Sequence, residues 1–243
     1  MEKAYKILAM QRSISNKRAK ELIDRGLVYI GGKKVRIARA EVDENTKFRI
    51  VEPADATIIY QDEDIVAIDK PAMIDSEEIE MAIEGAKLIH RLDRETSGVL
   101  LLSRNESFRR RAVDEFRAGR VFKEYSAWVE GRLFEEMTID SPIYTVKKGS
   151  AFSMVDNRRG KPAITRVYPD EVQGRKSKVR IVIETGRTHQ IRVHLSHAGH
   201  PVVGDEKYGS PTETGRILLH AGKVILLGRE YISQEPADIK RYK

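Results

Sequence analysis

The sequence predicts an α/β (α+β) fold in two domains, a small helix–hairpin domain followed by a larger domain with a mixed sheet and flanking helices. Nearly all of the excess positive charge lies in the first fifth of the chain: residues 1–52 carry 13 basic against 7 acidic residues, whereas residues 53–243 carry 31 against 30. The segment Glu52-Pro53-Ala54-Asp55 is typical of a connector. Beyond it, strand-like and helix-like stretches alternate. We therefore expect domains at 1–52 and 58–243, joined by a linker at 53–57.

The first domain is predicted to contain two helices and a hairpin. Ala4, Ile7 and Leu8 mark the apolar face of the first helix. Ser15 or Asn16 can cap the second helix, and Gly26 is well placed to end it. The pair Gly31-Gly32 predicts a tight hairpin, because both glycines tolerate positive φ. Its strands are expected over 28–30 and 35–37, with a third strand over 48–51.

The larger domain is predicted to alternate strands and helices. The uninterrupted apolar run Val99–Leu102 indicates a buried strand, and the alternation over Lys178–Glu184 indicates a half-buried one. Thr188 is expected to cap a helix that turns Ile191 and Leu195 inward. The remaining elements are strands over 58–60, 65–68, 217–219 and 224–227, and helices near 76–85, 105–118 and 188–198.

Composition excludes several classes of chemistry. The chain has no cysteine, which excludes disulfides, thiolate catalysis, Cys-ligated zinc and iron–sulfur clusters. No apolar stretch approaches the roughly 20 residues that span a bilayer, and the N-terminus lacks the apolar segment of a secretory signal. We expect a cytoplasmic protein without a membrane partner. Histidines 189, 194, 197 and 200 raise the possibility of a metal site, but their spacing is not H-E-x-x-H, so no metal is expected.

The basic N-terminal domain indicates binding to a polyanion, with a solvated lysine-rich surface as the alternative. Its candidate phosphate-facing residues lie on the second helix and at the hairpin turn: Lys17, Arg18, Lys20, Lys33 and Lys34. Residues 147–180 hold ten basic and three acidic residues, which fits a second RNA-facing loop or an exposed hairpin. The acidic residues between 75 and 84 are expected to face away from phosphate.

Three polar segments lie directly against apolar strands and could carry chemistry. Asp93, between Arg91 and Arg94, precedes a buried strand; it could be a nucleophile or general base kept ionised by its cationic neighbours, or part of a surface turn. Arg187 lies at a strand-to-helix turn, where it could bind substrate or tie the turn to a backbone carbonyl. Tyr125 could stack on a nucleobase or be an ordinary core aromatic.

These segments resemble one known family. His90-Arg91-Leu92-Asp93, followed by Thr96-Ser97-Gly98, is similar to the signature of the RluA-type pseudouridine synthases, and Gly186–His194 matches the second strong motif of that family. The resemblance continues through Gly204-Asp205 to Tyr208-Gly209, and Asp69-Lys70-Pro71 and Leu219-His220-Ala221 match weaker motifs. Residues 1–52 are similar to an S4 RNA-binding domain.

The resemblance implies a largely antiparallel mixed sheet and an enzyme that converts uridine in RNA to pseudouridine without a cofactor. Asp93 aligns with the essential aspartate of the family, and Arg187 with the arginine that pairs with it. Tyr125 aligns with the aromatic residue that stacks on the target uracil. Arg91 aligns with a residue that contacts RNA around the flipped nucleotide. The uracil pocket would be lined by Ile191 and Leu219.

The resemblance also suggests the partner, since relatives with an S4 domain favour large-subunit ribosomal RNA or its precursor particles. Transfer RNA remains an alternative target, and a binding or ribosome-assembly factor without catalysis is the rival function. A glycosidase is disfavoured, because no second carboxylate stands beside Asp93 in a comparable motif. The sequence departs from the family in two ways: no glycine follows Lys70-Pro71 closely, and the stretch from Pro71 to His90 is short.

Overall fold

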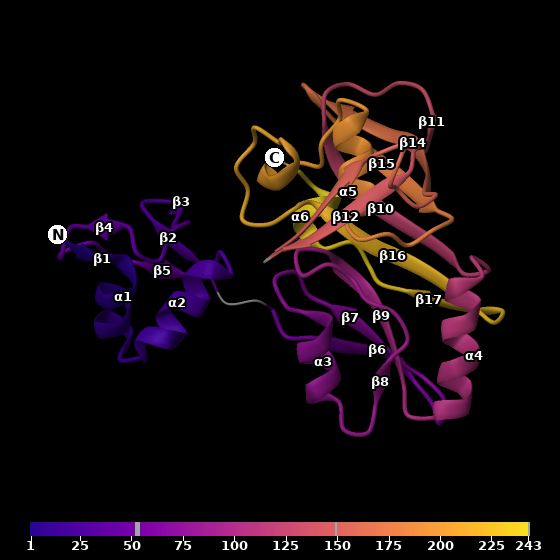
Figure 1. Ribbon diagram of the computed structural model, residues 1–243, viewed down its shortest axis with the longest axis horizontal. Helices are drawn as coiled ribbons and strands as arrows, with labels where there is room; N and C mark the ends of the chain where they lie inside the picture. The colour runs from indigo at the N-terminus through magenta and orange to yellow at the C-terminus, as the bar shows by residue number, and fades with distance from the viewer. Residues whose placement is uncertain (52–53, 149, 243) are drawn as a thin grey trace. The chain divides into compact units, whose positions relative to one another are not determined.

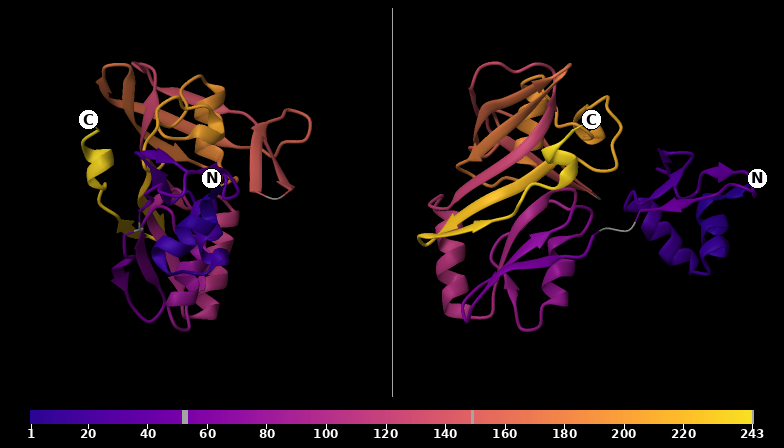
Figure 2. Two further views of the ribbon diagram at one scale, coloured as in Figure 1. Left: turned by 90° about the vertical axis from the view of Figure 1, so that its left-hand side faces the viewer. Right: turned by 180° about the vertical axis from the view of Figure 1, so that it is seen from behind.

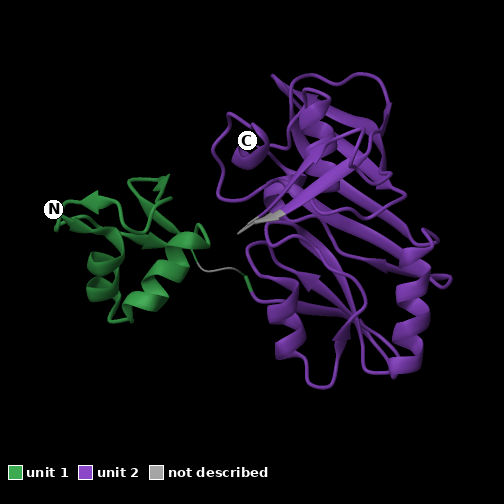
Figure 3. Cartoon of the chain, in the orientation of Figure 1, with its two compact units in different colours: residues 1–54 green, residues 55–243 purple. Residues whose placement is uncertain are grey.

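The chain folds into two compact units, residues 1–54 and 55–243, in a computed structural model that describes residues 1–51, 54–148 and 150–242 (Figure 3). The division between them falls inside the stretch expected to be a linker. Residues 52 and 53 of the expected connector lie outside the described residues.

Unit 1 consists of two helices and two small sheets. Ser15 caps α2, because its side chain accepts a hydrogen bond of 3.1 Å from the Arg18 backbone N–H. Apolar residues of both helices, including Leu8 and Ile23, are buried, as is Val28 of the sheet. The elements are α1 Ala4–Arg12 and α2 Asn16–Asp24, the pair β1 Glu2–Lys3 with β4 Glu41–Val42, and the sheet β3 Lys33–Lys34, β2 Val28–Ile30 and β5 Arg49–Ile50.

The hairpin of unit 1 is tighter than expected. Gly31 and Gly32 have φ values of 54° and 86°, as a two-residue turn requires, and Ile30 pairs directly with Lys33. The return strand therefore begins at Lys33, and the strand expected over 35–37 is wrong. Ile37 instead lies in a loop and is exposed.

Unit 2 is built on a ten-stranded sheet whose central path runs β11-β14-β15-β10-β16-β9-β7-β6, with β17 paired to β16 and β8 to β9 (Figure 1). Among these pairs, β16 and β9 run parallel and the others antiparallel, which confirms the mixed, largely antiparallel sheet. The strands are β6 Thr57–Gln61, β7 Val66–Lys70, β8 Lys87–Leu88, β9 Ser97–Ser103, β10 Phe122–Glu130, β11 Met137–Asp140, β14 Ile164–Gln173, β15 Lys176–Ile183, β16 Leu219–Leu226 and β17 Arg229–Ile232.

Helices cover both faces of this sheet. Successive residues of a strand point to opposite faces, so Leu101 packs with α4, Glu106–Arg117, whereas Leu100 and Leu102 pack with α3, Ser76–Ala82. On the α3 face, α5, Gln190–His197, buries Ile191 and Leu195 against β10 and β15. A short helix, α6 Ala237–Lys240, covers Trp128 on the opposite face. Tyr125 packs against both the α3 core and the α5 core, and so marks the middle of the shared face.

Two local expectations are corrected. The segments 217–219 and 224–227 do not form separate strands, since β16 runs continuously from Leu219 to Leu226, with Gly222 as a bulge residue opposite β10. Helix α5 begins one residue later than expected, with His189 rather than Thr188 at the N-cap. No helix in the part of the chain that the structure describes is long and apolar enough to cross a membrane.

A separate hairpin, β12 Ile143–Lys148 and β13 Ser150–Val155, stands away from the main sheet of unit 2 (Figure 2). It meets the rest of unit 2 through α5 and the 3-10 helix η1, Glu206–Tyr208: Phe152 of β13 stacks on Tyr208 with the ring centroids 5.5 Å apart. This hairpin corresponds to part of the basic stretch 147–180, and an exposed hairpin was one of the two expectations for it.

Gly98 brings two strands together beside the polar loop 91–96. Its φ is 113°, and a Cβ built on it would lie 2.2 Å from the carbonyl oxygen of Ala221. Only glycine fits this crossing, because any side chain would collide with backbone. The parallel contact of β9 with β16 therefore depends on Gly98 and delivers the loop before β9 to the centre of the sheet face.

Candidate active site

A pocket of about 860 Å³ opens on the sheet face between α3 and α5. It is lined by the loop 89–96, the C-terminal end of α4, β10 and the turn before α5. Six residues singled out in the sequence lie on its wall: Arg91, Asp93, Tyr125, Arg187, Ile191 and Leu219. The tertiary fold therefore brings residues that are up to 128 positions apart in the chain into one cavity.

Hydrogen bonds from Ser76 of α3 and Lys70 of β7 hold the loop that carries Asp93. Ser76 Oγ donates to the Leu92 carbonyl and accepts from the Leu92 N–H, both at 3.0 Å. Lys70 is fully buried, and its ammonium donates to three carbonyls, those of Pro71, Ile74 and Arg94. Burial lowers the pKa of Lys70 to about 8. The weak Asp69-Lys70-Pro71 motif thus holds the loop in place, a role that its sequence did not reveal.

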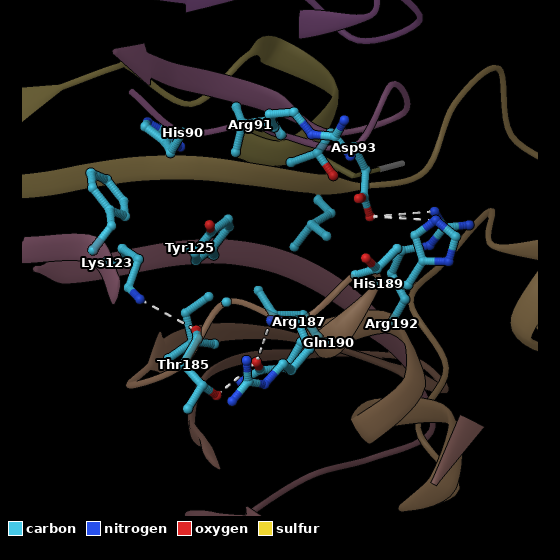
Figure 4. A pocket seen from close by; sticks show the side chains of 18 of the residues that line it. His90, Arg91, Asp93, Lys123, Tyr125, Thr185, Arg187, His189, Gln190 and Arg192 are labelled. Atoms are coloured by element: carbon cyan, nitrogen blue, oxygen red, sulfur yellow. Dashed lines mark hydrogen bonds and ion pairs between the residues drawn. The ribbon is translucent and has the colours of Figure 1, made fainter. Parts of the chain in front are cut away.

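The cation beside Asp93 is Arg192. Its Nη1 lies 3.5 Å from Asp93 Oδ2 and 3.4 Å from Glu95 Oε2, and the side chain is 2 % exposed (Figure 4). The same guanidinium grips Asp205 with two hydrogen bonds of 2.6 and 2.9 Å. One cation is therefore shared by three carboxylates, a buried cluster that orients Asp93 from the α5 side.

The expected pairing of Arg187 with Asp93 is wrong. Arg187 lies in the turn before α5, and its Nε donates to the Pro162 carbonyl at 3.0 Å. Arg192, which lies within the helix, reaches Asp93 instead. Arg187 matches the alternative considered for it, an arginine that ties the turn to a backbone carbonyl, although it still lines the pocket. The presence of an acidic residue, Asp205, that could pair with Arg192 was the feature of the sequence that could have pointed to Arg192. The two residues are 13 positions apart, however, and only the fold brings them together.

Burial dominates the electrostatics of Asp93. Desolvation raises the pKa of the Asp93 carboxyl above its ordinary value, although the charge of Arg192 opposes this. The expectation that its neighbours in sequence keep it fully stabilised as an anion is corrected. Arg91 turns away to pair with Glu77 at 2.8 Å, and Arg94 approaches Glu95 at 3.8 Å. The charged form of Asp93 is therefore less stabilised than that of a carboxylate in water.

Tyr125 projects into the pocket from β10, opposite a β-bulge of β16 (Figure 4). The register between the two strands shifts between Glu124 and Tyr125, because β16 carries one extra residue there, Gly222. Burial, followed by the charge of Asp93, raises the pKa of the Tyr125 hydroxyl, so the phenol stays protonated at neutral pH. The ring is partly exposed toward the cavity, and it offers an aromatic surface rather than a ready base.

Known proteins agree with this architecture. The family model for RNA pseudouridylate synthase matches residues 64–197. A protein of Helicobacter pylori strain J99, named an uncharacterized RNA pseudouridine synthase, is 44% identical over 242 residues, with 99% of this chain and all of the relative covered. The chain belongs to the RNA pseudouridine synthases. The enzymatic class expected from the two strong motifs is thereby confirmed.

Two further relatives bear on the synthase. The ribosomal large subunit pseudouridine synthase D of Haemophilus influenzae is 30% identical over 200 residues, which cover 74% of this chain and 60% of the relative. The structure of human RNA pseudouridylate synthase domain containing 1 superposes with a TM-score of 0.66 at 28% identity, over 77% of this chain and 87% of that one. The family model begins at residue 64, so it does not test the S4-like character of unit 1.

Arg91 and the acidic helix α3 form the rim of the synthase pocket. The Arg91 side chain is 68 % exposed, and its partner Glu77 lines the pocket with Asp75. Both belong to the acidic residues that were expected to face away from phosphate, and the structure places these two on the pocket wall. Arg91 belongs to the same loop as Asp93. Its ion pair with Glu77 therefore links α3 to that loop at the edge of the pocket.

The histidines near α5 serve internal contacts. His194 bonds Thr165 Oγ1 through Nδ1 and the Ser141 carbonyl through Nε2, both at 2.9 Å, and His200 Nδ1 lies 2.8 Å from the Glu130 carbonyl. Within residues 1–51, 54–148 and 150–242, no group of three or more His, Cys, Asp or Glu side chains could hold a metal ion.

The candidate RNA-binding cations of unit 1 lie on α2 and on the β2–β3 hairpin. Lys17 is exposed, and Arg18 pairs at 2.6 Å with Glu21 on the same helix. Lys20 lies with its ammonium 4.3 Å from the centre of the Tyr5 ring. Both Lys33 and Lys34 form β3. Unit 1 thus presents cations on a helix and on a neighbouring strand pair.

Proposed function

We propose that this synthase isomerises a specific uridine of large-subunit ribosomal RNA, with Asp93 as the essential carboxylate. The observation that carries this is the partly buried Asp93, held by Arg192 through Oδ2, on the wall of a pocket that also holds an aromatic ring and two apolar side chains. The relatives named large-subunit synthase D, at 30% identity and above, support the ribosomal target.

The reaction breaks the bond between uracil N1 and ribose C1′ and forms a bond from C5 to C1′. C5 releases its proton and N1 takes one up from solvent, so the product is an isomer of uridine. A base inside a helix cannot reach a pocket, so the target nucleotide must leave the stack, which requires a few kcal/mol. Tyr125 would stack on the extruded uracil, with Ile191 and Leu219 against its edges. Arg91, at the rim, would contact RNA around the flipped nucleotide.

Asp93 acts at the sugar, either by attack on C1′ or by removal of a proton from C2′. In both, a carboxylate whose charge is poorly stabilised before the reaction is the more reactive group. Arg192 orients this carboxylate, and its positive charge opposes the rise in the pKa of Asp93 that burial causes. The low polarity of the buried pocket strengthens these contacts at the reacting sugar.

Tritium release from transcripts labelled at uridine C5 tests the proposed reaction and its target together. Large-subunit ribosomal RNA should release up to one equivalent of tritium per molecule, because C5 loses its hydrogen only when the base is rejoined through that carbon. Small-subunit RNA and transfer RNA serve as matched controls. Release from transfer RNA alone would reassign the target, and no release from any RNA or precursor particle would support a binding factor.

Unit 1 is proposed as an S4-like RNA-binding domain. Reversing the charge of Lys17, Arg18 and Lys20 to glutamate should weaken RNA binding on the order of 10-fold or more and flatten its salt dependence, because phosphate contacts release counterions. Turnover at saturating RNA should change little.

The control for this prediction is an equal change of net charge on exposed residues of unit 2, at Lys87, Arg110 and Lys240. Filter binding at several salt concentrations measures both variants. Equal weakening by the two would show that net charge alone sets affinity, and unchanged binding in the unit 1 variant would show that the RNA uses another surface.

A further inference from the structure

His189 occupies a backbone conformation that calls for a functional reason. Its φ and ψ are 55° and 23°, in the left-handed region, at the N-cap of α5. Side-chain-bearing residues adopt this conformation at a cost and keep it where the surrounding contacts enforce it, often at active sites. The His189 side chain is 10 % exposed, and its Nε2 lies 4.0 Å from Asp93 Oδ2 (Figure 4).

Tyr208 holds the imidazole from its other side. Its hydroxyl lies 2.7 Å from His189 Nδ1, and the two rings meet edge to face with their centroids 5.6 Å apart. The same hydroxyl accepts a hydrogen bond of 3.0 Å from the Ser153 backbone N–H of β13. The position of His189 is therefore set by two elements remote from it in sequence, η1 and the hairpin β12–β13.

These contacts favour one tautomer of His189. The Ser153 N–H can only donate, so the Tyr208 hydroxyl accepts that bond, and its own proton remains available to give to Nδ1. The ring proton of the neutral imidazole is then on Nε2, the nitrogen that faces Asp93. The opposite tautomer would place a lone pair of Nε2 against the Asp93 carboxylate, which is repulsive.

The imidazole is held neutral as well as oriented. Burial, followed by the charge of Arg192, lowers the pKa of His189 to about 4. At neutral pH, His189 thus faces Asp93 with an N–H dipole and no net charge. Such a group can orient a carboxylate without forming an ion pair that would hold it away from substrate.

We propose that His189 is a positioning residue of the isomerisation, whose Nε2–H, fixed by Tyr208, orients the Asp93 carboxylate through Oδ2 and leaves Oδ1 for the ribose. This rests on the proposed role of Asp93. The 4.0 Å contact is that of the free enzyme, and such contacts tighten when substrate fills the site. The hairpin β12–β13 takes part, because its backbone supplies the hydrogen bond that sets the Tyr208 hydroxyl.

Two substitutions at position 189 separate orientation from structure. Asparagine tolerates the left-handed backbone but carries its amide near the place of Nδ1, short of Asp93. Glutamine carries its amide near the place of Nε2. We expect kcat for tritium release to fall about 10- to 100-fold in His189→Asn, as for loss of one hydrogen bond to a charged group, with KM nearly unchanged. His189→Gln should recover most of kcat.

Tyr208→Phe removes one hydroxyl and leaves the backbone at 189 untouched. It should lower kcat about 5- to 10-fold in the wild-type background and less than about 2-fold in the His189→Asn background, because coupled residues are not additive. His197→Gln, an exposed position at the far end of α5, is the control and should leave kcat unchanged.

The pH dependence of kcat distinguishes a positioning role of His189 from a purely structural one, because a purely structural role would not shift it. The charged and titratable groups facing Asp93 are Arg192 and His189 at α5, Glu95 beside it, Asp205, Lys207 and Tyr208 at η1, Lys70 on β7 and Tyr125 on β10. Only His189 is changed in one variant and only Tyr208 in the other. The first variant loses the Nε2–H and the second loses the hydroxyl that fixes it, so the acid limb of kcat should shift to higher pH in both His189→Asn and Tyr208→Phe.

Two results would overturn the assignment of His189 as a positioning residue. One is an acid limb of kcat that does not move in the variants. The other is an equal fall of kcat on Tyr208→Phe in the wild-type and His189→Asn backgrounds, since the hydroxyl would then act only through its contact with β13. If His189→Asn does not fold by circular dichroism, the acid limb of Tyr208→Phe decides. A wild-type enzyme that releases no tritium would contradict the proposed function instead, so the two failures are distinguishable.

Discussion

Replacing Asp93 with asparagine should abolish pseudouridine formation, with tritium release falling on the order of 10⁴-fold or more, as expected when a group that bonds to the reacting atoms is removed. The amide preserves the shape of the side chain and its place beside Arg192, but it offers no anion to the ribose. RNA binding should persist, because the variant removes a negative charge from a surface that meets phosphate.

The stability of the Asp93→Asn variant separates chemistry from unfolding. Burial raises the pKa of Asp93 in the folded state above its unfolded value, so the ionised side chain destabilises the fold at neutral pH and this burden disappears as pH falls. The neutral amide should therefore leave stability at pH 7 equal or higher. Thermal unfolding measures this beside the activity.

Glu95→Gln is the matched control for Asp93, since it removes one charge from the same cluster around Arg192. This variant should keep most of the activity. The loss of a catalytic group lowers turnover far more than about 10-fold. If Asp93→Asn retains more than about a tenth of wild-type turnover, Asp93 is not a catalytic residue.

Replacing Arg192 with methionine should damage both stability and catalysis. The side chain is buried and paired with Asp205, which is fully buried, so its loss strands a carboxylate and should lower the free energy of unfolding by about 3–5 kcal/mol. Removing the cation beside Asp93 also raises the pKa of that carboxyl further, so the remaining activity should require higher pH. Denaturant unfolding and a pH profile of tritium release measure the two effects.

Two comparisons isolate the cause of the Arg192 effect. Adding Asp205→Leu to Arg192→Met should recover stability, because it removes the stranded charge, but not activity. Arg187→Met should cost at most about 1 kcal/mol in stability, since its Nε bonds one backbone carbonyl and the side chain is partly exposed. A large loss of activity in Arg187→Met with little loss in the double variant would mean that Arg187, rather than Arg192, supports Asp93.

Local patterns in the sequence predicted the parts of this enzyme that depend on near neighbours. Ser15 caps α2 because its hydroxyl reaches an N–H three residues on, and the two glycines turn the hairpin because they accept positive φ. The run Val99–Leu102 is buried because it lies at the sheet centre, covered on both faces, as an uninterrupted apolar run indicates. The motif around Asp93 and that before α5 were enough to predict the family, and they contain four of the six predicted cavity residues, all but Tyr125 and Leu219.

Tertiary structure decided which charges meet. Arg187 and Arg192 are both arginines of one motif, and no local rule chooses between them, because the choice depends on where α5 begins and on which side of it Asp93 lies. The direction of the Asp93 pKa was also beyond sequence reasoning. Its flanking arginines predicted a stabilised anion, yet one of them pairs with Glu77 and the other approaches Glu95, while burial sets the balance.

The sequence by itself determined the two-unit organisation, the helices α1 to α5, the buried strands β7 and β9, and the identity of the family, since these follow from periodicity, turn chemistry and short motifs. The tertiary structure alone decided the Arg192–Asp205 clamp, the Lys70 support under the loop and the contact of His189 with Tyr208. Each of these joins groups that are distant in sequence, and a buried charge or hydrogen bond has its strength only when its partner and the surrounding exclusion of water are both in place.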